Sequence, residues 1–188
     1  MSKTALLLID IQNDYFTSFE GAKLPLNNME QSAVEAGKLL NKFREQQALV
    51  VHVRHQFPSA DAPFFQLGST GAETHSSVVP LENEETVVKH QINSFHETNL
   101  KEILDRNNIE NLVIVGAMSH MCIDAVTRAA SDYGYKCSLA HDACATFGQE
   151  FNGVTVSAED VHATYMAALG FAYAEVTSTE ELLEKIEL

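Results

Sequence analysis

Asp10, Lys89 and Cys122 are the residues of this sequence whose types and positions could perform chemistry together. Each stands at or just past the end of an apolar, β-branched run. A cysteine that attacks a carbonyl needs a base beside it or a lowered pKa, because a free thiol is only a few per cent ionised at neutral pH. Asp10 could exchange the thiol proton, and Lys89 could supply a positive charge. Together the three predict a thioester-forming hydrolase.

The stretch VGAMSHMCIDA, residues 115–125, predicts how Cys122 is activated. A helix from about His120 to Tyr133 would place the thiol near unpaired N–H groups and the positive end of the helix dipole, which should lower its pKa. The bend at Gly116–Ser119 should present backbone N–H groups to a tetrahedral oxyanion. Each such donor is worth roughly 3–4 kcal/mol in a transition state.

Alternating strand-like and helix-like segments must position these side chains. Helices are expected at 28–46, 97–108, 120–133, from Ser157 and from Ser178, the last two opened by capping boxes. Strands are expected at 3–10, 48–53, 86–90, 112–115, 136–142 and 172–178. Such alternation predicts right-handed crossovers and a mainly parallel sheet with helices on both faces. Ligands of such sheets bind beyond the carboxyl ends of the strands, where the three residues fall.

Composition limits the classes of protein that this chain can represent. Its 188 residues suit one domain, 1–188, with 45% apolar content and a formal charge of −14. That charge argues against a nucleic-acid partner and against anionic membranes. No segment approaches the roughly 20 apolar residues of a membrane helix, and none resembles a signal peptide. The odd number of cysteines favours reduced thiols, so we expect a cytoplasmic protein. We expect its partner to be a small-molecule substrate.

Three blocks of the sequence resemble the isochorismatase-like cysteine hydrolase superfamily, which includes nicotinamidases and N-carbamoylsarcosine amidase. They are LLLIDIQNDYF (6–16), VVKHQINSFHETNLKEIL (87–104) and LVIVGAMSHMCIDAVTRAASDYGYKCSLAHDACAT (112–146). The resemblance implies a three-layer α/β/α, Rossmann-like fold with a six-stranded, mainly parallel sheet. It implies a catalytic triad of Asp10, Lys89 and Cys122. It also implies an oxyanion hole from the N–H groups of Met118 and Cys122, a cis Ala117–Met118 peptide, and a homo-oligomer, dimer or tetramer.

Departures from the nicotinamidase pattern shape the expected site. Nicotinamidases carry metal ligands after the second strand, where this chain has His55 and Phe57, so we expect no metal and no cofactor. The nucleophilic cysteine, which true isochorismatases commonly lack, favours cleavage of a C–N bond in an amide, ureido or lactam-like substrate. The residues expected to line the substrate pocket are Gln12, Phe16, Arg54, His55, Glu73 and His120.

Two other functions remain open on the sequence. In the first, a vinyl ether hydrolase of the isochorismatase type, Asp10 works as a general acid and Cys122 is a bystander. In the second, a redox or binding module, Cys122 reacts with oxidants or holds a ligand without turnover. Cys137 and Cys144 are expected to be structural, because one alternates within a strand and the other lies in a loop.

Overall fold

A parallel six-stranded sheet forms the centre of the protein in the computed structural model, which describes residues 3–59, 61–186 and 188. The strands lie in the order β3-β2-β1-β4-β5-β8, and every neighbouring pair is parallel. Their bounds are β1 Thr4–Ile9, β2 Leu49–His55, β3 Glu85–Lys89, β4 Asn111–Ala117, β5 Lys136–Ala145 and β8 Ala174–Thr177. The sheet has the parallel, six-stranded arrangement that the sequence predicts.

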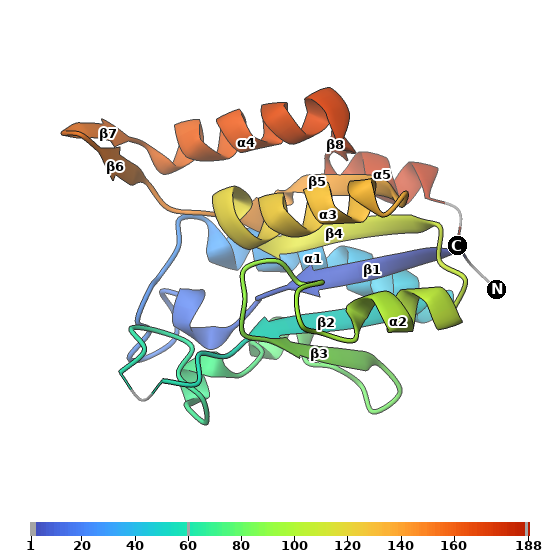
Figure 1. The fold of residues 1–188 in the computed structure, drawn as a ribbon, viewed down its shortest axis with the longest axis horizontal. Helices are drawn as coiled ribbons and strands as arrows, with labels where there is room; N and C mark the ends of the chain where they lie inside the picture. The colour runs from blue at the N-terminus through green and yellow to red at the C-terminus, as the bar shows by residue number, and fades with distance from the viewer. Residues whose placement is uncertain (1–2, 60, 187) are drawn as a thin grey trace.

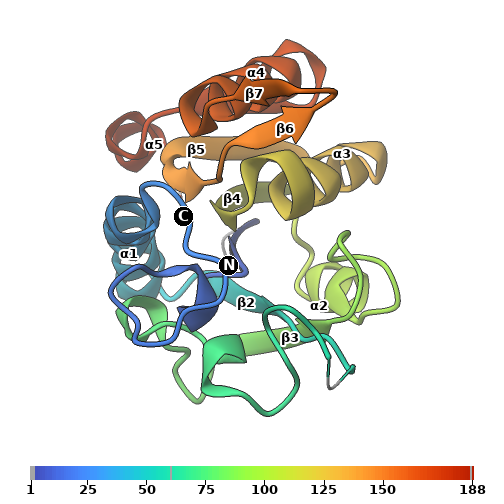
Figure 2. The same cartoon turned by 90° about the vertical axis from the view of Figure 1, so that its left-hand side faces the viewer.

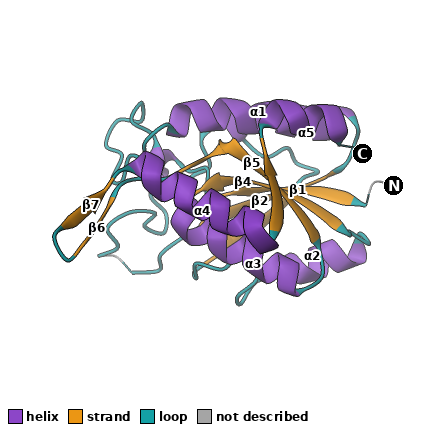
Figure 3. Cartoon of the chain, turned by 90° about the horizontal axis from the view of Figure 1, so that it is seen from above, coloured by secondary structure: helices purple, strands orange, loops and turns teal. Residues whose placement is uncertain are grey.

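Helices cover both faces of this sheet and make it a three-layer α/β/α structure (Figure 1, Figure 3). On one face lie α1 and α5, and on the other lie α2, α3 and α4. Their bounds are α1 Met29–Glu45, α2 Leu100–Arg106, α3 Asp124–Asp132, α4 Ala158–Ala172 and α5 Thr179–Lys185. Alternate strand residues feed the two cores: Leu6 and Leu8 pack on the α1 side, and Leu7 and Ile9 pack on the α2 and α3 side. Both faces of β1 are therefore buried, as a central parallel strand requires.

The carboxyl ends of the strands open toward one end of the molecule, where the long connections gather (Figure 2). The segment between β2 and β3 lies there and contains two short 3-10 helices, η2 Thr70–Ala72 and η3 Ser76–Val78. Another 3-10 turn, η1 Asn13–Tyr15, follows β1. This arrangement places the expected site where parallel sheets bind their ligands.

Two element boundaries differ from the sequence expectation, and one hairpin is additional. Helix α4 continues through Ala172, so the last strand begins at Ala174 rather than at 172. The expected helix at 120–133 starts as a π-helical turn, Ser119–Ile123, before α3. An antiparallel hairpin, β6 Gln149–Phe151 and β7 Val154–Val156, was not expected; it projects from the body before α4. Its Asn152 and Gly153 have positive φ angles, which a tight turn needs.

The starts of the two C-terminal helices agree with the sequence. Ser178 forms the full capping box with Glu181. At Ser157 only half of the expected capping box is present: its hydroxyl accepts from the Asp160 N–H, but the Asp160 carboxylate accepts from the Ser157 hydroxyl rather than from the Ser157 N–H. Both helices nevertheless start where expected. Within the described ranges no helix is both long and apolar enough to cross a membrane.

Candidate active site

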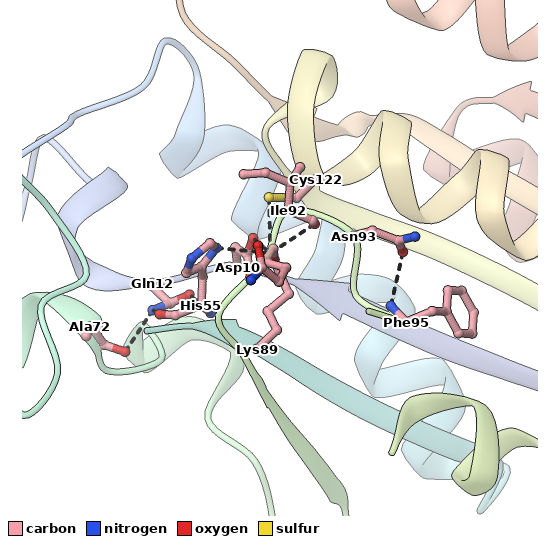
Figure 4. A network of polar contacts seen from close by, with 10 residues as sticks. Asp10, Gln12, His55, Ala72, Lys89, Ile92, Asn93, Phe95 and Cys122 are labelled. Carbon is pink, nitrogen blue, oxygen red and sulfur yellow. Dashed lines mark hydrogen bonds and ion pairs between the residues drawn. The ribbon is translucent and has the colours of Figure 1, made fainter. Parts of the chain in front are cut away.

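The ammonium group of Lys89 holds the predicted catalytic residues together. Its Nζ atom lies 2.9 Å from Asp10 Oδ2, 3.1 Å from Cys122 Sγ and 3.2 Å from His55 Nδ1 (Figure 4). Asp10 and Lys89 have no exposed surface, and Cys122 is 2% exposed. We call Asp10, His55, Lys89 and Cys122 the Lys89 cluster. Residues from β1, β2, β3 and the turn after β4 thus meet in one buried group.

Two backbone carbonyls fix the position of the Lys89 ammonium group. Nζ donates to the carbonyl oxygens of Gln91 and Ile92, each at 3.2 Å, so the chain after β3 folds back over its own lysine. Burial favours the neutral amine, but the Asp10 carboxylate and the Cys122 sulfur outweigh it and hold the pKa of Lys89 above its usual value. Lys89 therefore remains a cation at the centre of the cluster.

The Cys122 thiol is protonated at rest, which corrects the expectation of a lowered pKa. Burial, and then the negative charge of Asp10, raise the pKa of Cys122 well above its ordinary value, and the opposing effect of Lys89 is smaller. The sequence indicated a helix N-terminus near the thiol but could not show that the sulfur is buried beside a carboxylate. A thiol in this state needs a base at the moment of attack, and Asp10 is adjacent to receive the proton.

Backbone geometry at the end of β1 aims Asp10 at the cluster. Asp10 has a φ of 52°, a left-handed conformation that aspartate tolerates better than most residues. Its N–H donates to the carbonyl of Val53 at 2.9 Å. On the other side, Gly116 pairs with Ile9, and a Cβ atom at Gly116 would lie 2.0 Å from the Ile9 carbonyl oxygen. Only glycine lets β4 approach β1 closely enough to keep Asp10 and the Cys122 turn together.

The turn that carries Cys122 follows β4 directly. The Ala117–Met118 peptide is cis, as the resemblance implied. The carbonyl of Met118 accepts hydrogen bonds from the N–H groups of Met121 and Ile123, which closes the π-helical turn around Cys122. Ser119 anchors the turn through its hydroxyl group: Oγ lies 2.8 Å from His162 Nδ1 on α4 and 3.3 Å from the Ala145 carbonyl oxygen. The turn is therefore held by β5 and α4 as well as by its own backbone.

Of the residues expected in the pocket, His55 belongs to the Lys89 cluster and Gln12 supports it. Gln12 donates to the carbonyls of His55 and Ala72 at 2.8 Å and accepts from the His55 N–H at 2.7 Å (Figure 4). Its buried amide is thereby used on backbone groups. Gln12 joins the end of β2 to the η2 segment and fixes the position of the His55 backbone.

The other expected pocket residues lie outside the Lys89 cluster. Phe16 is buried and stacks on His75 with ring centroids 3.6 Å apart. Arg54 alternates with His55 along β2 and so points to the opposite face of the sheet. Glu73 is exposed. His120 shares the turn of Cys122, but its Nδ1 lies 2.6 Å from Thr146 Oγ1 and its ring packs edge-on against Phe147 and Tyr165.

Sequence reasoning missed Tyr15 and Asp14, which follow Asp10 in the same block. Burial, and then the charges of Asp10 and Cys122, raise the pKa of Tyr15 well above its usual value, so its hydroxyl stays protonated beside the cluster. Asp14 accepts a 2.7 Å hydrogen bond from the Phe65 N–H, and the Phe65 ring lies 4.5 Å from that of Tyr15. Asp14 thus ties the long β2–β3 connection to η1. The signal available in the sequence was a second acidic residue four positions after Asp10.

The metal set of nicotinamidases does not fit these residues. Phe57, at the second ligand position, has no donor atom, and its ring packs on His55 with centroids 4.2 Å apart. Asp10, His55 and Cys122 do bring ligand atoms within 4.8 Å of one another. The Lys89 ammonium, however, lies within 3.2 Å of an atom from each of them, so a metal ion would sit against another cation. The positive charge beside the Asp10 carboxylate is supplied by Lys89.

The fold and the Lys89 cluster define a three-layer α/β/α protein with a thiol, a carboxylate and a cation at the carboxyl rim of its sheet. Residues 4–181 match the Isochorismatase domain, and the chain belongs to this family of hydrolases. It is 47% identical to the uncharacterized isochorismatase family protein YddQ of Bacillus subtilis over 96% of this chain and 99% of that one.

Two further comparisons extend this assignment. The crystal structure of a protein from Oleispira antarctica, named as an isochorismatase hydrolase, superposes with a TM-score of 0.94 at 61% identity, covering 96% of each chain. A streptothricin hydrolase from Streptomyces noursei is 31% identical over 95% of this chain and 60% of its own length. The family and the fold predicted from the sequence are confirmed by these matches.

Proposed function

We propose that this hydrolase cleaves a C–N bond in a small amide, ureido or lactam-like substrate through a thioester on Cys122. The observation that carries the proposal is the contact of one buried ammonium, Lys89 Nζ, with both the Asp10 carboxylate and the Cys122 sulfur. A cation in that position stabilises the carboxylate at rest and the thiolate as it forms. The resemblance to a streptothricin hydrolase is in keeping with hydrolytic chemistry.

The first half-reaction would form the thioester and release the amine. As Cys122 Sγ attacks the substrate carbonyl carbon, Asp10 takes the thiol proton and the carbonyl electrons move onto oxygen. The N–H groups of Met118 and Cys122 would bind this oxyanion, and each donor would contribute roughly 3–4 kcal/mol. Asp10 then gives its proton to the leaving nitrogen, the C–N bond breaks, and the acyl group stays on sulfur as a thioester.

Water completes the cycle through the same residues. Asp10 removes a proton from the water molecule as its oxygen attacks the thioester carbon, and the same N–H groups bind the second oxyanion. Collapse of this intermediate breaks the C–S bond, releases the acid and returns the Asp10 proton to sulfur. Lys89 keeps its charge throughout, so the two protonation states of Asp10 alternate beside a constant cation.

The test is a screen of small amides, ureides and lactams with the wild-type protein, Cys122→Ala and Cys137→Ala. Cys137 is also buried, but it lies at the start of β5, near Thr127 and Tyr135 and at the end of the sheet away from the Lys89 cluster. It is therefore a matched control. We expect Cys122→Ala to lose turnover and Cys137→Ala to keep it. Mass spectrometry of quenched wild-type reactions should find the acyl group on Cys122. Full turnover by Cys122→Ala would contradict the mechanism.

The same variant separates the competing functions. If the protein cleaved a vinyl ether with Asp10 as the general acid, Cys122→Ala would remain active while Asp10→Asn would not. A reactive Cys122 without any hydrolytic turnover would favour the redox or binding module. The raised pKa of Cys122 weighs against a redox sensor, because redox-sensing thiols are typically ionised near neutral pH.

A further inference from the structure

His55 places a hydrogen-bond donor in the Lys89 cluster that the proposed mechanism does not use. The residue ends β2, pairs in register with Lys89 of β3, and is 3% exposed. Its ring lies next to Asp10 at the carboxyl ends of the strands (Figure 4). One ring nitrogen lies within 4.8 Å of ligand atoms of Asp10 and Cys122, so the ring belongs to the same buried group as the thiol.

Hydrogen-bond chemistry fixes which nitrogen of His55 carries the proton. A lysine ammonium has only donors, so Nδ1, 3.2 Å from Lys89 Nζ, must be the acceptor. The proton of the neutral ring is therefore on Nε2. Burial, and then the charge of Lys89, lower the pKa of His55 to about 4, which keeps the ring neutral near pH 7.

The Nε2 donor has no partner in the part of the chain that the structure describes. The nitrogen is buried, and no side-chain or backbone acceptor bonds to it. Phe57 packs on the ring at 4.2 Å, and Phe65 lies at 6.5 Å, so the ring has aromatic neighbours. A buried donor left unpaired is costly, whereas a bound acceptor would satisfy it.

We propose that His55 is a specificity-determining residue that donates from Nε2 to a second acceptor oxygen of the substrate. This inference rests on the proposed hydrolysis at Cys122. The first oxygen, on the attacked carbonyl, goes to the backbone N–H groups of the Cys122 turn, so His55 must bind a different atom. The preferred substrates are then small amides or ureides with another carbonyl only a few bonds from the scissile one.

Matched pairs of amides test this preference directly. Malonamide and 3-methylbutanamide have similar shapes, but only malonamide has a second carbonyl; 2-oxopropanamide and 2-methylpropanamide form a second pair. The measured quantity is the ratio of kcat/KM within each pair, for the wild type, His55→Leu, His55→Gln and Phe57→Leu. Comparing this ratio between variants cancels the intrinsic reactivity of the amides. It also cancels any general damage from the lost contact with Lys89.

We expect His55→Leu to lower the ratio by about 10- to 100-fold, the rate equivalent of one buried hydrogen bond. His55→Gln, which keeps a donor and an acceptor, should recover part of it, and Phe57→Leu should retain it. An unchanged ratio in His55→Leu, with turnover of both amides still abolished by Cys122→Ala, would overturn the role of His55 alone. Turnover that survives Cys122→Ala would instead overturn the proposed function.

Nitrogen NMR of the histidines gives a test that does not depend on turnover. With the signal assigned by its loss in His55→Gln, His55 should be neutral and protonated on Nε2 at pH 7. Malonamide, added to Cys122→Ala, should shift that Nε2–H signal, and 3-methylbutanamide should not. A His55 that is protonated on Nδ1, charged at pH 7, or equally affected by both amides would contradict the proposal.

Discussion

Strand β2 carries two buried histidines, and the charge of each one's partner distinguishes a structural cluster from a candidate catalytic one. His52 faces the α1 side, where its Nε2 lies 2.8 Å from the carboxylate oxygen Oε2 of Glu84. His55 faces the other side, where its Nδ1 lies 3.2 Å from the Lys89 ammonium. A carboxylate partner requires the histidine to donate, whereas an ammonium partner requires it to accept. The two rings therefore carry their protons on Nε2 for opposite reasons and present opposite groups to their surroundings.

Glu84 uses its hydrogen bonds to hold the structure together. Arg44 of α1 donates to both of its oxygens, at 2.7 and 2.8 Å, and the Leu81 N–H donates at 2.9 Å. We call Arg44, His52 and Glu84 the Glu84 cluster. Burial raises the pKa of Glu84, but the bonds from Arg44, Leu81 and His52 outweigh it and lower the pKa to about 2. This cluster fastens the segment before β3 to α1.

The Lys89 cluster differs because it keeps unsatisfied groups beside Cys122, the proposed nucleophile. Among the described residues, Asp10 Oδ1 and His55 Nε2 are buried without a hydrogen-bond partner. The Glu84 cluster leaves only the acceptor nitrogen His52 Nδ1 in that state. Burial alone therefore does not distinguish the two clusters, since both histidines are at most 3% exposed. The difference is a donor and a carboxylate oxygen left available next to a thiol.

The largest expected effect comes from removing the carboxylate of the Lys89 cluster. Asp10→Asn should lower kcat/KM by about 10²- to 10⁴-fold, the usual contribution of a general acid–base group. It should also lower the pKa of Cys122, because the Asp10 charge raises it. The variant would then have a more reactive thiol and less hydrolytic activity. Activity assays and the pH dependence of iodoacetamide labelling of Cys122 measure the two effects.

Glu84→Gln is the control for that experiment. It removes a buried carboxylate on the other face of β2 and should change neither activity nor the labelling profile of Cys122. Retained activity in Asp10→Asn, or a Cys122 pKa that rises in it, would contradict the catalytic role proposed for the Lys89 cluster.

Removing the cation should destabilise the protein more in the Lys89 cluster than in the Glu84 cluster. Lys89→Met leaves Asp10 uncompensated in a site without solvent exposure, and we expect a loss of about 3–5 kcal/mol in the free energy of unfolding. Arg44→Met acts on a side chain that is 26% exposed, and the expected loss is about 1–3 kcal/mol. Urea denaturation of both variants at pH 7 measures the difference. Equal losses would mean that the two ion pairs have equivalent environments.

The smallest expected effect is on the pH dependence of the free energy of unfolding, in which each cluster should contribute over a different pH range. His55 has a pKa of about 4 in the folded protein and 6.5 in its ordinary state. The unfolded chain therefore binds more protons between these values, and stability should fall as the pH drops from 6.5 to 4. The loss is at most about 3 kcal/mol, reduced by solvent screening. Glu84, with a pKa of about 2 against 4.5, should contribute its loss between pH 4.5 and 2.

Variants identify the groups responsible for each window. His55→Gln should flatten the profile between pH 6.5 and 4, and Glu84→Gln should flatten it below pH 4.5. Because burial also lowers the pKa of His52, His52→Gln is needed to subtract its share of the upper window. An upper window that is unchanged in His55→Gln would show that His55 is charged in the folded protein.

The sequence was sufficient for features that depend on local pattern and on which residues stand at the ends of strands. Apolar runs alternating with amphipathic segments predicted the parallel sheet and its two helical layers, because each run had to be buried on both faces. Asp10, Lys89 and Cys122 stand at strand ends, so their meeting at one rim followed from the topology. Ser178 and Glu181 predicted the start of α5 through hydrogen bonds within a single turn.

Other features depend on contacts between distant segments, and only the tertiary structure decided them. The direction of the Cys122 pKa shift depends on burial and on its distance to Asp10, and sequence reasoning about a helix dipole gave the wrong sign. Whether Gln12 lined a pocket or clamped the backbone depended on where the His55 and Ala72 carbonyls came to lie. Sequence determined which chemical groups reach the rim of the sheet, because the place of each residue along its own strand is encoded locally. Tertiary packing decided which of them are protonated and which keep a free hydrogen-bonding atom, because these properties depend on solvent exclusion and on distances of a few ångströms.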